Sequence, residues 1–210
     1  MSWRVLLLIL ALVSAELIIS AVVSNPNWIM SQINQERESI IHWVGYDNTR
    51  KIINKADTWY VALFQDSGVE SSTNAFFIPE QSGFEDVADI DEKGQYIISI
   101  LQEQLFVIWG QCYYALQRLS LLMEWFPYIL LLLVPAVIDG AMTREIKKIS
   151  YGFTSELRYV FGYKILITLL IIPFVYLFSP IAISTLAIPI WTVTLAVAAL
   201  LMSSNLQKWI

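Results

Sequence analysis

Four long apolar tracts alternate with polar segments along the chain. They run over residues 5–23, 119–138, 159–178 and 181–202. Each has about the 20 residues that a helix needs to cross the hydrocarbon core of a bilayer. Glu16 interrupts the first tract. Val13-Ser14-Ala15 resembles a signal-peptide cleavage site, but apolar residues continue beyond it to residue 23. The pattern predicts an all-α membrane protein with four transmembrane helices.

The segment between the first two apolar tracts is more polar than the tracts themselves. Within residues 25–63, apolar side chains recur at helical spacing in two stretches, which predicts two amphipathic helices arranged as a hairpin. The first stretch contains Ile29, Ile33, Ile40, Ile41 and Val44, and the second contains Ile52, Ile53, Ala56, Tyr60 and Leu63. We therefore expect an aqueous, mainly helical insertion between the first and second transmembrane helices.

A long helical pattern begins near Gln95 and reaches Ile138, too far for one perpendicular crossing. Its first half carries several Gln residues and Arg118, whereas its second half is almost wholly apolar. We expect the second half to cross and the first half to be an extramembrane helix. The alternative is that residues 97–115 cross instead, which would invert the topology.

These patterns divide the chain into six parts. They are a first transmembrane helix (1–24), an extracytoplasmic helical region (25–118), a second transmembrane helix (119–138), a basic cytoplasmic loop (139–164), third and fourth transmembrane helices (165–204) and a cytoplasmic tail (205–210). Pro173 lies inside the third apolar tract, and Ser179-Pro180 predicts a tight turn before the fourth.

Charge distribution gives the orientation. The chain is 57% hydrophobic and 15% charged, with a formal net charge of -5. Residues 25–100 hold twelve Asp or Glu against five Lys or Arg, whereas basic residues dominate between Asp139 and Lys164. Short loops rich in Lys and Arg stay on the cytoplasmic side. The sequence thus predicts a multi-pass membrane protein, with both termini cytoplasmic and the acidic insertion outside.

No catalytic or cofactor motif accompanies this architecture. His42 is the only histidine and Cys112 the only cysteine, so neither a zinc cluster nor an internal disulfide is expected. The acidic run Glu85, Asp86, Asp89, Asp91 and Glu92 lacks the Gly-containing spacing of a calcium loop. We expect no enzyme activity, no cofactor and no metal.

Acidic residues near the apolar tracts leave a second function open. Glu16, Glu124 and Asp139 lie within or beside predicted spans, where ionisable residues often mark ion pathways. A small transporter or channel using Glu16 and Glu124 is therefore an alternative, although no inverted repeat supports it. A sensor built on the acidic external loop is another.

The connection after the second tract holds the candidate site. Asp139, Gly140, Arg144, Lys147 and Lys148 form what we call the basic segment. Asp139-Gly140 is expected to cap the exit of the second span, while Ile146, Ile149 and Phe153 share an apolar stripe. Such a segment can anchor at lipid headgroups or dock a cytoplasmic partner. DNA binding is not expected, because the cations are few and lack interleaved aromatic side chains.

The same region resembles a known family. Pro135-Ala136, the basic segment, and then Gly152, Ser155, Tyr159 and Lys164 resemble the TraJ-like integral inner-membrane proteins of conjugative plasmids and integrating conjugative elements. The resemblance extends through Pro173 and Ser179-Pro180 to the ending 203–209, so it covers about residues 118–210. Gly152-Phe153-Thr154-Ser155-Glu156 stands where relatives have a Gly-Arg-Glu-Ser stretch.

This resemblance implies a noncatalytic component of a conjugation or type IV secretion apparatus, located in the bacterial inner (plasma) membrane. It would support or tether the coupling ATPase, whose cytoplasmic part would approach the basic segment. Other channel subunits are further expected partners besides the lipid bilayer, and a homo-oligomer is compatible with the sequence.

Overall fold

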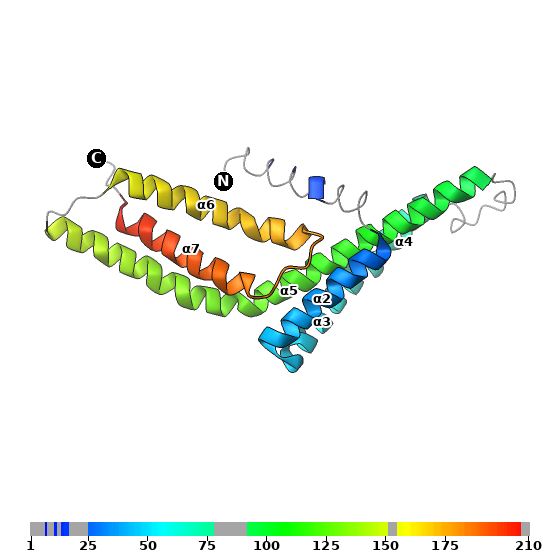
Figure 1. Ribbon diagram of the computed structural model, residues 1–210, viewed down its shortest axis with the longest axis horizontal. Helices are drawn as coiled ribbons and strands as arrows, with labels where there is room; N and C mark the ends of the chain where they lie inside the picture. The colour runs from blue at the N-terminus through cyan, green and yellow to red at the C-terminus, as the bar shows by residue number, and fades with distance from the viewer. Residues whose placement is uncertain are drawn as a thin grey trace. The chain divides into compact units, whose positions relative to one another are not determined.

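The computed structural model describes residues 7, 11, 14–16, 25–77, 92–150 and 155–206. In these ranges the ordered elements are all helical and no strand occurs, which confirms the all-α class. The helices are α2 (Pro26–Val44), α3 (Tyr46–Tyr60), a π-helical turn η1 (Val61–Gln65), α4 (Val69–Phe77), α5 (Glu92–Ile149), α6 (Glu156–Phe178) and α7 (Ala187–Ser204) (Figure 1).

The predicted first transmembrane helix, the acidic run at 85–91 and the end of the predicted tail lie outside these ranges, apart from a few residues of the first helix. Three of the described helices are long and apolar enough to cross a membrane. They are formed by Tyr96–Ile149, Leu157–Phe178 and Ala187–Ser204. These three helices are consistent with a membrane protein, and the fourth crossing stays a prediction.

The chain divides into two compact units. Unit 1 contains Met1–Leu121 and Phe174–Ile183, and unit 2 contains Leu122–Pro173 and Ser184–Ile210. Both α5 and α6 contribute to each unit.

Unit 1 is built on the first half of α5. Pro26 occupies the first turn of α2, where its missing N–H has no partner to lose. Ile29 and Ile33 of α2 pack against Val107 and Tyr114 of α5. Helix α3 follows at Gly45, whose φ of 86° lies in the left-handed region that favours glycine. The two predicted amphipathic helices are confirmed.

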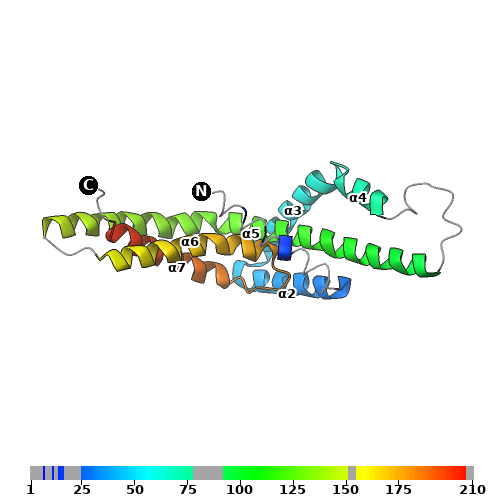
Figure 2. The same ribbon diagram turned by 90° about the horizontal axis from the view of Figure 1, so that it is seen from above.

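Unit 2 packs the second half of α5 with α6 and α7, which run alongside one another in both views (Figures 1 and 2). Leu169 of α6 and Leu195 and Ala198 of α7 form its buried core. The Trp191 indole N–H donates to the Leu169 carbonyl oxygen at 2.8 Å. Much of the remaining apolar surface of α5 is exposed, Leu131 at 71% for example, as expected for a helix that faces lipid.

Two helix boundaries differ from the predicted ones. Helix α5 continues through Asp139-Gly140 to Ile149, so these residues do not cap a helix end and the capping prediction was wrong. Helix α7 begins at Ala187, and the predicted tight turn at Ser179-Pro180 is a longer connection. The reason lies in unit 1, where backbone groups of residues 181–183 bond to side chains of α2 and α5 in place of helical partners.

Candidate functional site

The basic segment lies on about the last three turns of α5, and its members have different surroundings. Asp139 is exposed and Gly140 is buried. Gly140 touches α7 so closely that a Cβ there would overlap the Ser203 hydroxyl and lie 3.0 Å from the Leu200 carbonyl oxygen. Small residues at such contacts let membrane helices approach each other closely. Gly140 therefore serves packing within unit 2, out of reach of a partner.

The three cations of the segment also divide by role. The Lys147 ammonium donates to the Ser204 carbonyl oxygen at 3.1 Å and to Asn205 Oδ1 at 3.3 Å, so it binds the carboxyl end of α7. Lys148 pairs with Glu145 on the exposed surface. Arg144 has no hydrogen-bond or ion-pair partner within the described ranges. Of the three, Arg144 and Lys148 are the ones a partner could reach.

A buried ion pair that the sequence analysis missed lies in unit 1. Arg118 Nη2 is 2.7 Å from Glu36 Oε2, and both side chains are 0% exposed. Arg118 Nε also donates to Glu36 Oε1, at 3.0 Å. The Tyr114 hydroxyl donates to Glu36 at 2.5 Å, and the Tyr176 hydroxyl at 3.3 Å. We call Glu36, Tyr114, Arg118 and Tyr176 the Arg118 network.

Arg118 also binds the end of α6. Its Nη1 donates to the carbonyl oxygens of Tyr176 and Ser179, at 2.5 and 2.6 Å, and its Nη2 donates to Ile181 at 2.6 Å. The last carbonyls of a helix have no partner inside the helix, and the negative end of the helix dipole attracts a cation. Gln111 adds a bond to the Phe178 carbonyl oxygen at 2.6 Å. Two side chains of α5 thus cap α6.

The backbone after α6 is held from α2 as well. The Ala182 N–H donates to Gln32 Oε1 at 2.8 Å, and the Ile183 N–H donates to Glu36 Oε2 at 3.1 Å. The Arg118 guanidinium lies 4.0 Å from the ring centroid of Tyr114 and 4.8 Å from that of Tyr176. Every group on the guanidinium has an acceptor, so the network joins three chain segments and leaves no donor for a substrate.

The sequence does carry a signal for half of this network. Ile29, Ile33, Glu36 and Ile40 recur at helical spacing, so Glu36 lies on the apolar face of α2, and all four residues are buried. A carboxylate on a buried face needs a cation or several donors. No local pattern shows that its partner is Arg118, 82 residues further along the chain.

The two acidic residues on which the transporter hypothesis rests, Glu16 and Glu124, lie in different environments. Glu16 Oε2 is buried without a hydrogen-bond partner in the described part of the chain. Glu124 is exposed on α5. Among the described residues, no group of three or more His, Cys, Asp or Glu side chains could hold a metal ion.

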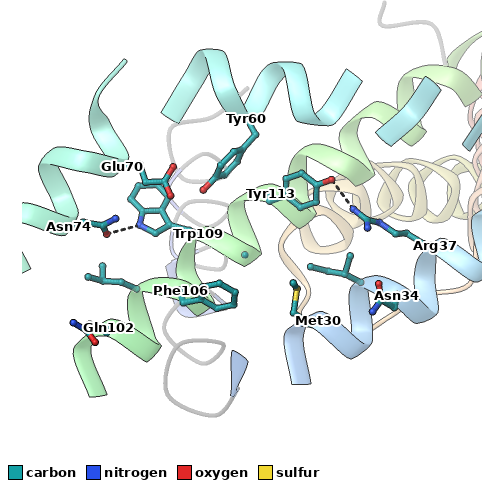
Figure 3. Close-up of a pocket in the computed structure, with 13 residues that line it drawn as sticks. Met30, Asn34, Arg37, Tyr60, Glu70, Asn74, Gln102, Phe106, Trp109 and Tyr113 are labelled. Atoms are coloured by element: carbon teal, nitrogen blue, oxygen red, sulfur yellow. Dashed lines mark hydrogen bonds between the residues drawn. The ribbon is translucent and has the colours of Figure 1, made fainter. Parts of the chain in front are cut away.

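Unit 1 also contains a pocket of about 480 Å³ between α2, α4 and α5 (Figure 3). Its lining includes Arg37, Tyr60, Glu70, Asn74, Trp109 and Tyr113. Burial raises the pKa of the Tyr60 hydroxyl, and the neighbouring negative charge of Glu70 raises it further, so Tyr60 stays a neutral hydrogen-bond donor.

With this geometry established, comparison with known proteins gives one match. Residues 28–207 match the family described as IncC plasmid conjugative DNA transfer protein DtrJ-like. No curated protein and no solved structure matches the chain. The resemblance to conjugation proteins is thereby confirmed, whereas the TraJ-like assignment is not part of the match. Since the match begins in α2 and continues beyond α7, the chain belongs to the DtrJ-like family and takes part in conjugative DNA transfer.

Proposed function

We propose that this chain is a noncatalytic inner-membrane component of the conjugative type IV secretion apparatus that tethers the coupling ATPase. Membership of the DtrJ-like family supports a role in conjugative DNA transfer. The three long apolar helices support a location in the membrane. Because Gly140 is buried and Lys147 is engaged within unit 2, the proposed docking surface narrows to Arg144 and Lys148. Asp139 is exposed earlier on α5.

The proposed topology has residues 1–24, 119–138, α6 and α7 crossing the bilayer, with both termini cytoplasmic. The observation that carries it is the pairing of helix ends. Arg118 contacts the residues that end α6, so residue 118 and the end of α6 lie at one level. Gly140 and Lys147 contact residues that end α7, so those positions share another level.

These pairings favour residues 119–138 as the second span over residues 97–115. A chain that crossed at 97–115 and again along α6 would leave Arg118 and Ser179 on opposite faces of the membrane, yet they are 2.6 Å apart. Crossing at 119–138 and returning along α6 leaves them on the same face. Short loops rich in Lys and Arg then assign the basic segment to the cytoplasm.

Co-purification with the coupling ATPase tests the tether. The double variant Arg144→Glu/Lys148→Glu reverses both reachable charges, whereas Arg50→Glu reverses an exposed charge on α3, outside the proposed docking surface. We expect the first variant to reduce recovery of the ATPase from detergent extracts about tenfold, equivalent to about 1.4 kcal/mol, with the control unchanged. Equal recovery with both variants would refute docking through this surface.

DNA transfer frequency provides a second readout in the same strains. A tether that positions the motor should lose transfer in parallel with ATPase recovery. Reduced recovery with full transfer would show that the contact exists without serving conjugation.

A further inference from the structure

The pocket of unit 1 has a charge that its surroundings do not balance. The half-buried Glu70 carboxylate accepts a hydrogen bond from the Tyr60 hydroxyl. Its Oε2 atom is buried and has no hydrogen-bond partner among the described residues. The two ion pairs in those residues join Glu36 to Arg118 and Glu145 to Lys148, so neither includes Glu70. A carboxylate oxygen removed from water is unfavourable unless a cation or a further donor compensates it.

The cation that lines the same pocket is already compensated. Arg37 Nη2 donates to the Tyr113 hydroxyl at 2.8 Å, and that hydroxyl donates to Asp57 Oδ1 at 2.7 Å. Arg37 Nε donates to Gln117 Oε1 at 2.9 Å. The relay from Arg37 through Tyr113 to Asp57 pairs one positive charge with one negative charge. Among the described residues that line the pocket, the Glu70 charge is therefore the one without a cationic partner.

The walls of the pocket suit a cation. Trp109 and Tyr113 are part of an aromatic cluster with Tyr60 and Phe64, in which neighbouring ring centroids lie 5.4 to 5.7 Å apart. The Trp109 indole N–H donates to Asn74 Oδ1 at 3.2 Å, which fixes the ring and occupies its polar edge (Figure 3). The π faces of aromatic rings attract ammonium or guanidinium groups.

We propose that this pocket receives a basic side chain, Lys or Arg, of a partner polypeptide. Glu70 supplies the counter-charge, and the rings of Trp109 and Tyr60 cover the aliphatic stem and the cationic head. Asn74 holds the Trp109 indole in place, and Tyr60 holds the Glu70 carboxylate. This site differs from the docking surface proposed for the ATPase, and it stands or falls independently of that surface.

Fluorine NMR of the full-length protein in nanodiscs tests the site locally. The protein contains eight Trp residues, and 5-fluorotryptophan labelling gives each a resonance. Loss of one line in Trp109→Phe assigns the probe. Blocked tripeptides with a central Lys, Arg or norleucine are then titrated to about 10 mM, ten times the Kd of a millimolar site. Putrescine serves as a free diamine.

We expect the Lys and Arg peptides to shift the Trp109 line in a saturable way and the norleucine peptide to leave it in place. Glu70→Gln should raise the peptide concentration that gives half of the maximal shift about tenfold. Glu38→Gln, which changes an exposed residue of α2, should not raise it. An equal effect of norleucine, no shift with any peptide, or a shift with putrescine alone would overturn the proposal. The comparison of peptides uses the unaltered protein, so it stands even if Glu70→Gln fails to fold.

Discussion

Removing the Glu36 carboxylate should strongly destabilise unit 1. Glu36→Met keeps a side chain of similar length but leaves the Arg118 charge buried at 0% exposure without its counter-ion. Removing one member of a buried ion pair costs about 3–5 kcal/mol. For a chain of this size, that loss corresponds to a decrease in Tm of about 6–20 °C.

The reverse change, Arg118→Met, should be at least as damaging. It leaves Glu36 without its cation and also removes the donor from three carbonyl groups around the end of α6. Each buried acceptor without a partner adds about 1–3 kcal/mol. The double variant Glu36→Met/Arg118→Met removes both charges of the pair, so it should lose less stability than the sum of the single changes, by about 0.5–3 kcal/mol.

Thermal unfolding of the purified protein in one detergent measures all three variants. Glu38→Gln is the matched control, since Glu38 lies on the same helix with an exposed side chain. Single variants within about 2 °C of the unaltered protein would refute the reasoning, because that shift is under about 1 kcal/mol. Strictly additive losses would refute the pairing.

Two further predictions concern the contacts of α5 with α7, and both are measured as shifts in Tm. Gly140→Val should lower the free energy of unfolding by about 1–3 kcal/mol, because even a Cβ at this position would overlap Ser203. Ala141→Val, on the exposed side of the helix, should have little effect. Equal Tm shifts in the two variants would contradict the close contact. Lys147→Met should lower the free energy of unfolding by about 1–3 kcal/mol, because it removes the hydrogen bonds to the end of α7. Lys148→Met should lower it by at most about 1 kcal/mol, because the ion pair of Lys148 is exposed. The opposite ranking of the two variants would contradict this assignment of roles.

The helices could be predicted because their signals are local. The helical spacing of Ile29 and Ile33 predicts α2, and Asn25-Pro26 predicts where this helix starts. The apolar tracts give α6, α7 and the second half of α5 because a bilayer selects for length and hydropathy.

Helix ends were harder to predict, because they depend on distant partners. Asp139-Gly140 has the composition of a helix end, yet it lies inside α5, where Gly140 fits closely against Ser203 of α7. Ile181 follows Pro180 in an apolar stretch of sequence, yet it does not begin a helix, and its carbonyl oxygen accepts a hydrogen bond from Arg118. Both contacts join residues at least 60 positions apart, which no local pattern encodes.

The candidate site was predictable only as a set of charges. Arg144, Lys147 and Lys148 are alike in sequence, and their division into reachable and engaged cations depends on the carboxyl end of α7. Glu70 likewise appears as one acid among many in an acidic region. Its interest comes from its place beside Tyr60 and from a buried Oε2 atom that has no hydrogen-bond partner among the described residues.

The membrane side of the basic segment tests the central claim most directly. Cys112→Ser removes the sole cysteine, after which Lys148→Cys or Tyr46→Cys introduces one exposed thiol. A membrane-impermeant maleimide applied to intact cells should label Tyr46→Cys and reach Lys148→Cys only after the inner membrane is permeabilised. Labelling of Lys148→Cys in intact cells would place the basic segment outside the cytoplasm, away from any ATPase, and would contradict the account.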